Sequence, residues 1–227
     1  MSYDLNIVKK PWGYEYLVYE NQNVGLWFLY IAPNQSTSMH CHPKKTTGLV
    51  LLDGKAEVSF LADTRVIDSL DKVMIRRGLF HSTKALSDKG AWIFEIETPK
   101  DKHDLVRLKD QYGRSYKPYE DDTFEESKTD QCLWLSQPEL NKTNNYQFAN
   151  CNILVETIDN IEIINNKQDE DLLIFLDGGM VRTIDGVSHC VTIPGDVGFA
   201  KIVKQVSKEL DGVVPGTILL TICKNEK

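Results

Sequence analysis

The chain has 227 residues, of which 41% are hydrophobic and 26% charged, so it is long enough to bury one large core or two smaller ones. Its 33 acidic and 26 basic side chains give a net charge of −7, which disfavours binding to nucleic acid or to an anionic membrane. No apolar run approaches the ~20 residues that span a bilayer, and the first residues lack a secretory pattern. We therefore expect a cytoplasmic protein without membrane or nucleic-acid partners.

Short apolar runs separated by turn residues predict a mostly β protein. In the first half the predicted strands cover residues 25–31, 48–52, 56–61, 72–75 and 91–97. Asp53-Gly54 between two of these runs predicts a tight hairpin, because glycine readily supplies the positive φ that such a turn needs. Strands at this spacing indicate a sandwich or barrel, and we expect the first domain to cover residues 1–115.

Charged and polar residues follow, and we interpret residues 116–144 as a polar connector with a short helix beginning near Asp122. Apolar runs then return over residues 153–158, 161–164, 172–176, 180–184 and 217–222. They predict a second β domain over residues 145–227. Residues 47–54 and 171–178 both contain an apolar run that ends in Leu-Asp-Gly, and this internal repeat favours a duplicated β domain.

The five cysteines are odd in number, scattered along the chain and never arranged as CxxC. This pattern disfavours a disulfide framework and a cysteine zinc site. We therefore predict free thiols at Cys41, Cys132, Cys151, Cys190 and Cys223.

Three of the five histidines form a candidate metal site, His40 and His42 in one strand and His81 further along. Residues i and i+2 of a strand point to the same face, so His40 and His42 can present two imidazoles side by side. His81 follows a predicted strand and can approach from a neighbouring one. Three neutral imidazoles suit Zn, Fe, Ni or Mn and leave a position open for substrate. An exposed or hydrogen-bonded pair of strand histidines is the alternative.

Two basic pairs flank these histidines: Lys44 and Lys45 follow His42, and Arg76 and Arg77 precede His81. If the loops of a barrel bring them together, they can hold a phosphate or carboxylate at the mouth of the site. Solvated loop charges are the alternative. We expect that neutral replacements of Lys45 and Arg77 weaken sugar-phosphate binding and leave the thermal midpoint nearly unchanged.

Glu95 and Glu97 lie on one face of an otherwise apolar predicted strand. A carboxylate that faces the inside of a barrel can act as a general base or as a late metal ligand. We select Glu95 as the candidate proton carrier, and surface carboxylates are the alternative.

Several motifs resemble the cupin superfamily. The spacing of His40, His42, position 47 and Gly54, followed by Gly78-x-x-His81, is similar to the two-part cupin motif. A closer resemblance, to the cupin domain of type II phosphomannose isomerases and mannose-1-phosphate guanylyltransferases, rests on the blocks 10–15 (KPWGYE), 38–42 (SMHCH) and 104–114 (DLVRLKDQYGR). The chain departs from the family at Thr47, where cupins have a glutamate, and at Arg76, where they have a proline.

The resemblance implies an all-β cupin jelly-roll barrel, duplicated as a bicupin with a degenerate second domain. It also implies a homodimer that acts on a sugar phosphate or nucleotide sugar in surface-polysaccharide biosynthesis. We predict a metal-dependent isomerase or epimerase, in which the metal polarises a carbonyl and Glu95 moves a proton. The metal ligands would be His40, His42 and His81, and the substrate-binding residues Lys44, Lys45, Thr47, Arg76 and Arg77.

The missing carboxylate at Thr47 leaves alternatives open. A non-catalytic sugar-binding or regulatory cupin is the main one, and a metal-dependent dioxygenase is supported by the fold alone. Without a carboxylate ligand, we expect the metal to be lost on chelation or below about pH 6, as histidines protonate near their reference pKa of ~6.5.

Overall fold

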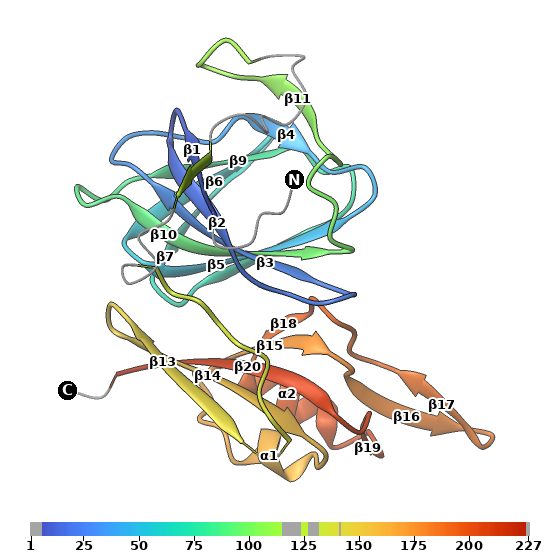
Figure 1. Ribbon diagram of the computed structural model, residues 1–227. Helices are drawn as coiled ribbons and strands as arrows, with labels where there is room; N and C mark the ends of the chain where they lie inside the picture. The colour runs from blue at the N-terminus through green and yellow to red at the C-terminus, as the bar shows by residue number, and fades with distance from the viewer. Residues whose placement is uncertain (1–5, 115–123, 127–131, 141, 226–227) are drawn as a thin grey trace. The chain divides into compact units, whose positions relative to one another are not determined.

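The computed structural model describes residues 6–114, 124–126, 132–140 and 142–225. The chain forms two compact units, Met1–Glu20 with Gly25–Leu133, and Asn21–Val24 with Trp134–Lys227 (Figure 1). No helix among the described residues has the length and apolar character needed to cross a membrane. Strands dominate both units, and every pairing between named strands is antiparallel.

The first unit contains two sheets. One is formed by β1 (Asn6–Lys10), β2 (Gly13–Glu20), β3 (Gly25–Ile31), β5 (Thr46–Asp53), β8 (Lys72–Ile75), β10 (Ala91–Thr98) and β12 (Phe124–Glu126), in the order β12-β1-β2-β3-β10-β5-β8. The other is formed by β4 (Met39–Cys41), β6 (Lys55–Phe60), β7 (Thr64–Asp68), β9 (His81–Ala85) and β11 (Val106–Lys109), in the order β11-β4-β9-β6-β7.

The pairing of the central strands is nested. β3 pairs with β10, β4 with β9, β5 with β8 and β6 with β7, and the pairs alternate between the two sheets. A chain that winds back along itself in this way gives the double-sheet jelly roll of cupins. The first unit is therefore a cupin-type jelly roll, in agreement with the predicted fold class.

The core of this jelly roll changes from apolar to charged along β10. Alternate residues of a strand share a face, so Ile93, Glu95 and Glu97 form one row. Ile93 belongs to the apolar core between the sheets, together with Leu29, Leu51, Ala56 and Val58. Glu95 and Glu97 continue the same row and are only 7% and 2% exposed. The barrel therefore has an apolar end and an end lined by buried charges.

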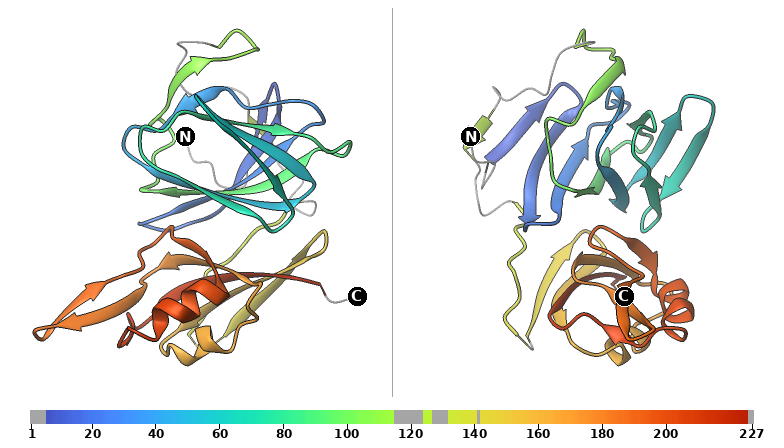
Figure 2. Two further views of the ribbon diagram at one scale, coloured as in Figure 1. Left: turned by 180° about the vertical axis from the view of Figure 1, so that it is seen from behind. Right: turned by 90° about the vertical axis from the view of Figure 1, so that its right-hand side faces the viewer.

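The second unit contains a five-stranded sheet and a three-stranded sheet. The larger consists of β13 (Thr143–Phe148), β14 (Cys151–Ile158), β15 (Leu172–Asp177), β18 (Val197–Phe199) and β20 (Thr217–Lys224), in the order β13-β14-β20-β15-β18. The smaller has the order β17-β16-β19 and consists of β16 (Met180–Ile184), β17 (Val187–Cys190) and β19 (Gly212–Val213). The helices α1 (Glu162–Asn165) and α2 (Ala200–Ser207) lie on one side of the larger sheet (Figure 2).

Some predicted elements differ from the observed ones. Asp53-Gly54 is a turn in which Gly54 has φ +97°, but β5 and β6 belong to different sheets, so the turn crosses between sheets and closes no hairpin. Residues 161–164 were predicted as a strand, but α1 begins at Glu162, where the Asn160 side chain accepts the Glu162 N–H and starts a helical turn. Residues Phe124–Glu126 form β12 against β1 in place of a helix, while Asp122 lies outside the described residues.

Other expectations agree closely with the structure. β3, β8 and β16 have the predicted bounds. All five cysteines are free thiols, and burial raises the pKa of Cys41, Cys132 and Cys223, so these three stay protonated near neutral pH. β13 begins at Thr143, inside the stretch interpreted as a connector, and residues 116–123, 127–131 and 141 of that stretch lie outside the described chain.

Candidate metal centre and adjoining pocket

Three imidazoles come together where β4 pairs with β9: His40 lies in β4, His42 follows directly after the end of that strand, and His81 is the first residue of β9. His40 lies opposite His81 in the pairing of β4 with β9. The ring centroid of His40 is 4.4 Å from that of His81 and 4.9 Å from that of His42, and the His42 and His81 centroids are 5.4 Å apart. One nitrogen of each ring lies within 4.8 Å of the other two, so the three histidines form a group that can hold a metal ion.

Backbone carbonyls orient all three rings. The Nδ1–H of His40 donates to Ser38 O at 2.8 Å, that of His42 to Asp104 O at 2.6 Å and that of His81 to Leu79 O at 3.0 Å. A neutral ring that donates from Nδ1 carries its lone pair on Nε2, the arrangement found in metal-ligating histidines. His42 Nε2 is buried without a hydrogen-bond partner. A divalent ion would satisfy this orphaned atom, so the site fits a metal.

Burial keeps the three imidazoles neutral. It lowers the pKa of His42 to about 2 and that of His81 to about 4, with the Lys45 ammonium adding to the effect on both. Burial and the two neighbouring imidazoles lower the pKa of His40 well below its ordinary value. The expectation that these histidines protonate near pH 6.5 is therefore wrong. Protons compete with a metal here only in more acidic solution.

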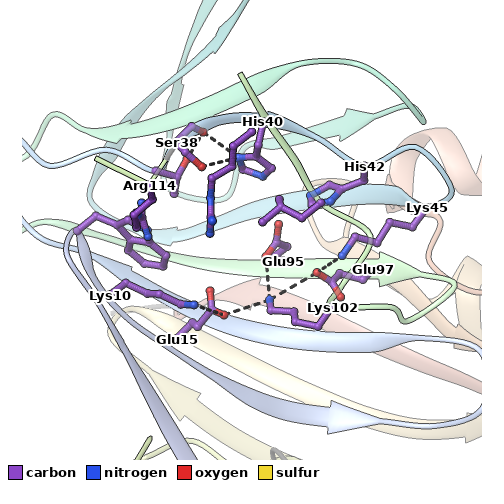
Figure 3. A pocket seen from close by; sticks show the side chains of 14 residues that line it. Lys10, Glu15, Ser38, His40, His42, Lys45, Glu95, Glu97, Lys102 and Arg114 are labelled. Atoms are coloured by element: carbon purple, nitrogen blue, oxygen red, sulfur yellow. Dashed lines mark hydrogen bonds and ion pairs between the residues drawn. The ribbon is translucent and has the colours of Figure 1, made fainter. Parts of the chain in front are cut away.

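Charged side chains line a pocket beside the histidines (Figure 3). It offers about 60 Å³ of water-accessible space, and several polar groups converge on it. A cavity of this volume holds several water molecules or part of a small polar ligand. Its lining includes Lys10, Trp12, Glu15, Ser38, His40, His42, Lys45, Glu95, Glu97, Lys102, Arg107 and Arg114.

Glu95 lies in this pocket where it can exchange a proton near neutral pH. Burial raises the pKa of Glu95 to about 7, although the Lys102 ammonium acts in the opposite direction. Glu95 lines the same cavity as His40 and His42. A carboxyl group with a pKa near the operating pH can serve as both general base and general acid.

Of the four predicted basic residues, the structure brings only Lys45 into the pocket lining. Its side chain is 1% exposed, and its Nζ binds Glu97 at 2.7 Å and donates to Asp101 O at 2.9 Å. Lys44, Arg76 and Arg77 are exposed and do not line the pocket. The backbone of the loop before His81 contacts His42, because Gly78 N–H donates to His42 O. The side chains of Arg76 and Arg77 in this loop are exposed to solvent.

Thr47 occupies the position at which cupins carry a glutamate. It lies opposite Glu97 in the pairing of β5 with β10, and residues directly opposite share a face of the sheet. Thr47 is 1% exposed, its Oγ1 has no hydrogen-bond partner, and it is not part of the pocket lining. Thr47 therefore supplies no carboxylate, and the carboxylates that line the pocket are Glu95 and Glu97 of β10 and Glu15 of β2.

Several pocket residues were not predicted as part of the site from the sequence. Lys10, Glu15, Ser38, Arg107 and Arg114 all line the pocket and all belong to the three blocks that carry the phosphomannose isomerase resemblance. The three blocks were therefore the sequence signal that could have located these pocket residues. Lys102 gave none, because it stands in a run of charged residues, 100–104 (KDKHD), and such runs are usually solvated.

Comparisons with known proteins find similar solved structures but no similar sequence. No protein-family model and no curated protein matches the sequence. Among solved structures, the chain is similar to KdgF from Halomonas sp. at 14% identity, with 40% of this chain and 84% of that chain covered and a TM-score of 0.39. A Klebsiella pneumoniae protein with a double-stranded beta-helix domain matches at 14% identity over 48% and 90% of the chains, with a TM-score of 0.39. The Schizosaccharomyces pombe Cnp3 cupin domain matches at 12% identity over 38% and 61%, with a TM-score of 0.37.

Proposed function

We propose that the first unit is a metal-dependent isomerase or epimerase of a phosphorylated or nucleotide-linked sugar. One observation carries this proposal: Glu95, a buried carboxyl whose pKa is raised to about 7, shares a small cavity with the oriented imidazoles of His40 and His42. A divalent ion held by His40, His42 and His81 would polarise a carbonyl of the substrate. The Glu95 carboxylate removes the proton from the carbon beside that carbonyl, and the Glu95 carboxylic acid returns it to the substrate.

The assignment of a phosphorylated substrate is supported by the cationic lining of the pocket. Lys10, Arg107 and Arg114 line it together with Glu95, and lysine and arginine are ordinary partners of phosphate. The assignment to surface-polysaccharide biosynthesis depends on the family resemblance.

A non-catalytic sugar-binding cupin is the second candidate. Thr47 contributes no carboxylate, and the Lys45 ammonium lies close enough to the imidazoles to lower the pKa of all three. Both features weaken the attraction of the site for a cation. A module that only binds sugar would also make no use of the proton on Glu95.

We further propose that the second unit is a degenerate copy of the first. The pairs β14–β20, β15–β18 and β16–β17 are nested in the same way as β3–β10, β5–β8 and β6–β7. No pair corresponds to β4–β9, the pair that carries the histidines, because α1 stands between β14 and β15 and β19 pairs with β16 among the described residues. This favours a structural role for the second unit, without a metal site of its own.

Proton exchange with solvent separates the two candidate functions. The protein is loaded separately with Zn, Fe(II), Ni or Mn and incubated in D₂O with sugar phosphates and nucleotide sugars, and deuterium incorporation is followed by NMR. We expect deuterium at the carbon beside the carbonyl of at least one sugar, only with metal present. Sugar binding without exchange under any of the four metals would decide for the binding module.

A further inference from the structure

Lys102 stands at the centre of the buried charges in the pocket. It belongs to the loop 99–105 between β10 and β11, and its side chain is 9% exposed. Its Nζ lies 3.3 Å from Glu15, 3.5 Å from Glu97 and 3.9 Å from Glu95. The same ammonium lies 3.7 Å from the centroid of the Trp27 ring, whose face attracts cations. One loop residue therefore joins the carboxylates of β2 and β10 (Figure 3).

The three carboxylates differ in the other cations that they contact. Glu97 also binds Lys45 at 2.7 Å, and Glu15 also lies 3.7 Å from Lys10. Within the described part of the chain, Lys102 is the one cation at ion-pair distance from Glu95. Loss of the Lys102 charge would therefore leave Glu15 and Glu97 paired, and Glu95 would face those two carboxylates without its cation.

We propose that Lys102 is a positioning residue that holds Glu95 in place and sets the pH range over which Glu95 accepts a proton. This inference rests on the proposed function, in which Glu95 carries the proton. A buried carboxyl without a cationic partner favours its neutral form, and neighbouring carboxylates reinforce that preference. Without Lys102, Glu95 would become a proton acceptor only in more alkaline solution.

Other charged groups around Glu95 act less strongly or in the opposite direction. Glu97 and Glu15 raise its pKa by repulsion, whereas Lys45 lowers it as Lys102 does. The remaining titratable or charged side chains of the pocket are Lys10, His40, His42, Arg107 and Arg114. None of these groups is removed when Lys102 is changed, so Lys102→Met takes away one charge of the network.

The test compares Lys102→Met with Lys102→Arg, and uses Lys100→Met as the matched control. Lys100 belongs to the same loop but is exposed and pairs with Glu20 at 2.8 Å. All proteins are saturated with the same divalent metal. The Glu95 carboxyl is titrated by ¹³C NMR, with Glu95→Gln identifying its signal, and the pH profile of deuterium exchange is recorded in parallel.

We expect Lys102→Met to move both the Glu95 titration and the acidic limb of the rate profile upward by about one pH unit or more. Exchange at pH 7 would then be at least about fivefold slower and would recover in alkaline solution. Lys102→Arg keeps the charge and should restore most of the profile, and Lys100→Met should leave it unchanged. An unchanged Glu95 titration in folded Lys102→Met would overturn the proposal.

A second variant keeps the test possible if Lys102→Met does not fold. Lys102→Met combined with Glu15→Gln removes one cation and one anion, so the charge balance of the network is kept, and a smaller upward shift of the Glu95 titration is expected. The NMR titration needs no turnover. If the Glu95 titration shifts but no sugar exchanges its proton, the role of Lys102 stands and the proposed function is rejected. If a sugar exchanges its proton but the Glu95 titration does not shift, the proposed function stands and the role of Lys102 is rejected.

Discussion

Replacing Glu95 by glutamine is expected to slow deuterium exchange into the sugar by about 10²–10⁴-fold, the usual contribution of a positioned general acid or base. Glutamine keeps the shape of the side chain but cannot accept the proton. The fold should not suffer. Because burial raises the pKa of Glu95 to about 7, its ionisation costs nothing below its unfolded pKa of about 4.5, and the cost grows as the pH rises toward 7. At about pH 8 the variant should therefore be at least as stable as the wild type.

Glu20→Gln is the matched control for this experiment. Glu20 lies at the end of β2 in the same sheet, but its side chain is 40% exposed and pairs with Lys100. Its replacement should leave the exchange rate unchanged. Wild-type exchange in Glu95→Gln would instead show that another group carries the proton.

Replacing Lys45 by methionine is expected to destabilise the first unit by about 3 kcal/mol. The side chains of Lys45 and Glu97 are 1% and 2% exposed, and their ion pair is 2.7 Å long. Removing one partner of a buried pair costs about 3–5 kcal/mol, because the other charge is left uncompensated. We expect the lower end of this range, since Lys102 still lies 3.5 Å from Glu97. Lys45→Met combined with Glu97→Gln should recover most of the loss.

Urea unfolding followed by tryptophan fluorescence measures this effect, because Trp12, Trp27 and Trp92 all lie in the first unit. The control is Lys55→Met. Lys55 pairs with Asp68 at 3.2 Å, but their side chains are 49% and 68% exposed, and an exposed pair contributes at most about 1 kcal/mol. Equal small losses for Lys45 and Lys55 would mean that Lys45 is solvated, as expected of an anion-binding loop.

The grouping of the histidines and the placement of Glu95 could be predicted from local patterns. Strand alternation puts His40 and His42 on one face, and the same rule puts Glu95 and Glu97 in one row. The apolar runs also located β3, β5, β6, β8 and β10, because a strand buried on both faces shows a continuous apolar run. These features depend on neighbours within a few residues, which a sequence displays directly.

The charge network could not be predicted in the same way. Lys44 and Lys45 are adjacent and chemically identical, yet Lys44 is exposed and Lys45 pairs with Glu97, 52 residues away along the chain. Lys102 stands in a run of charges, and such runs are usually solvated. Only the fold of the loop 99–105 brings its ammonium to Glu15 and Glu95.

The strand pairing around the Asp53-Gly54 turn could not be predicted from the local sequence either. Asp53-Gly54 has the sequence of a hairpin turn, and Gly54 does adopt a positive φ. Whether such a turn joins paired strands depends on their partners, and β5 pairs with β8 and β10, while β6 pairs with β7 and β9. Of these partners, β8, β9 and β10 lie well beyond the turn in the chain, so the local sequence predicts the bend but not the change of sheet.

The metal content of protein prepared without a histidine tag tests the three-histidine site most directly. After equilibration with Zn, Fe(II), Ni or Mn and removal of excess ion, elemental analysis should find one ion per chain in the wild type. The variant with His40, His42 and His81 all replaced by glutamine should hold none, and His189→Gln, at an exposed position of β17, should hold as much as the wild type. Equal metal content in the wild type and the triple variant, or no ion in the wild type with any of the four metals, would contradict the assignment of His40, His42 and His81 as the metal site.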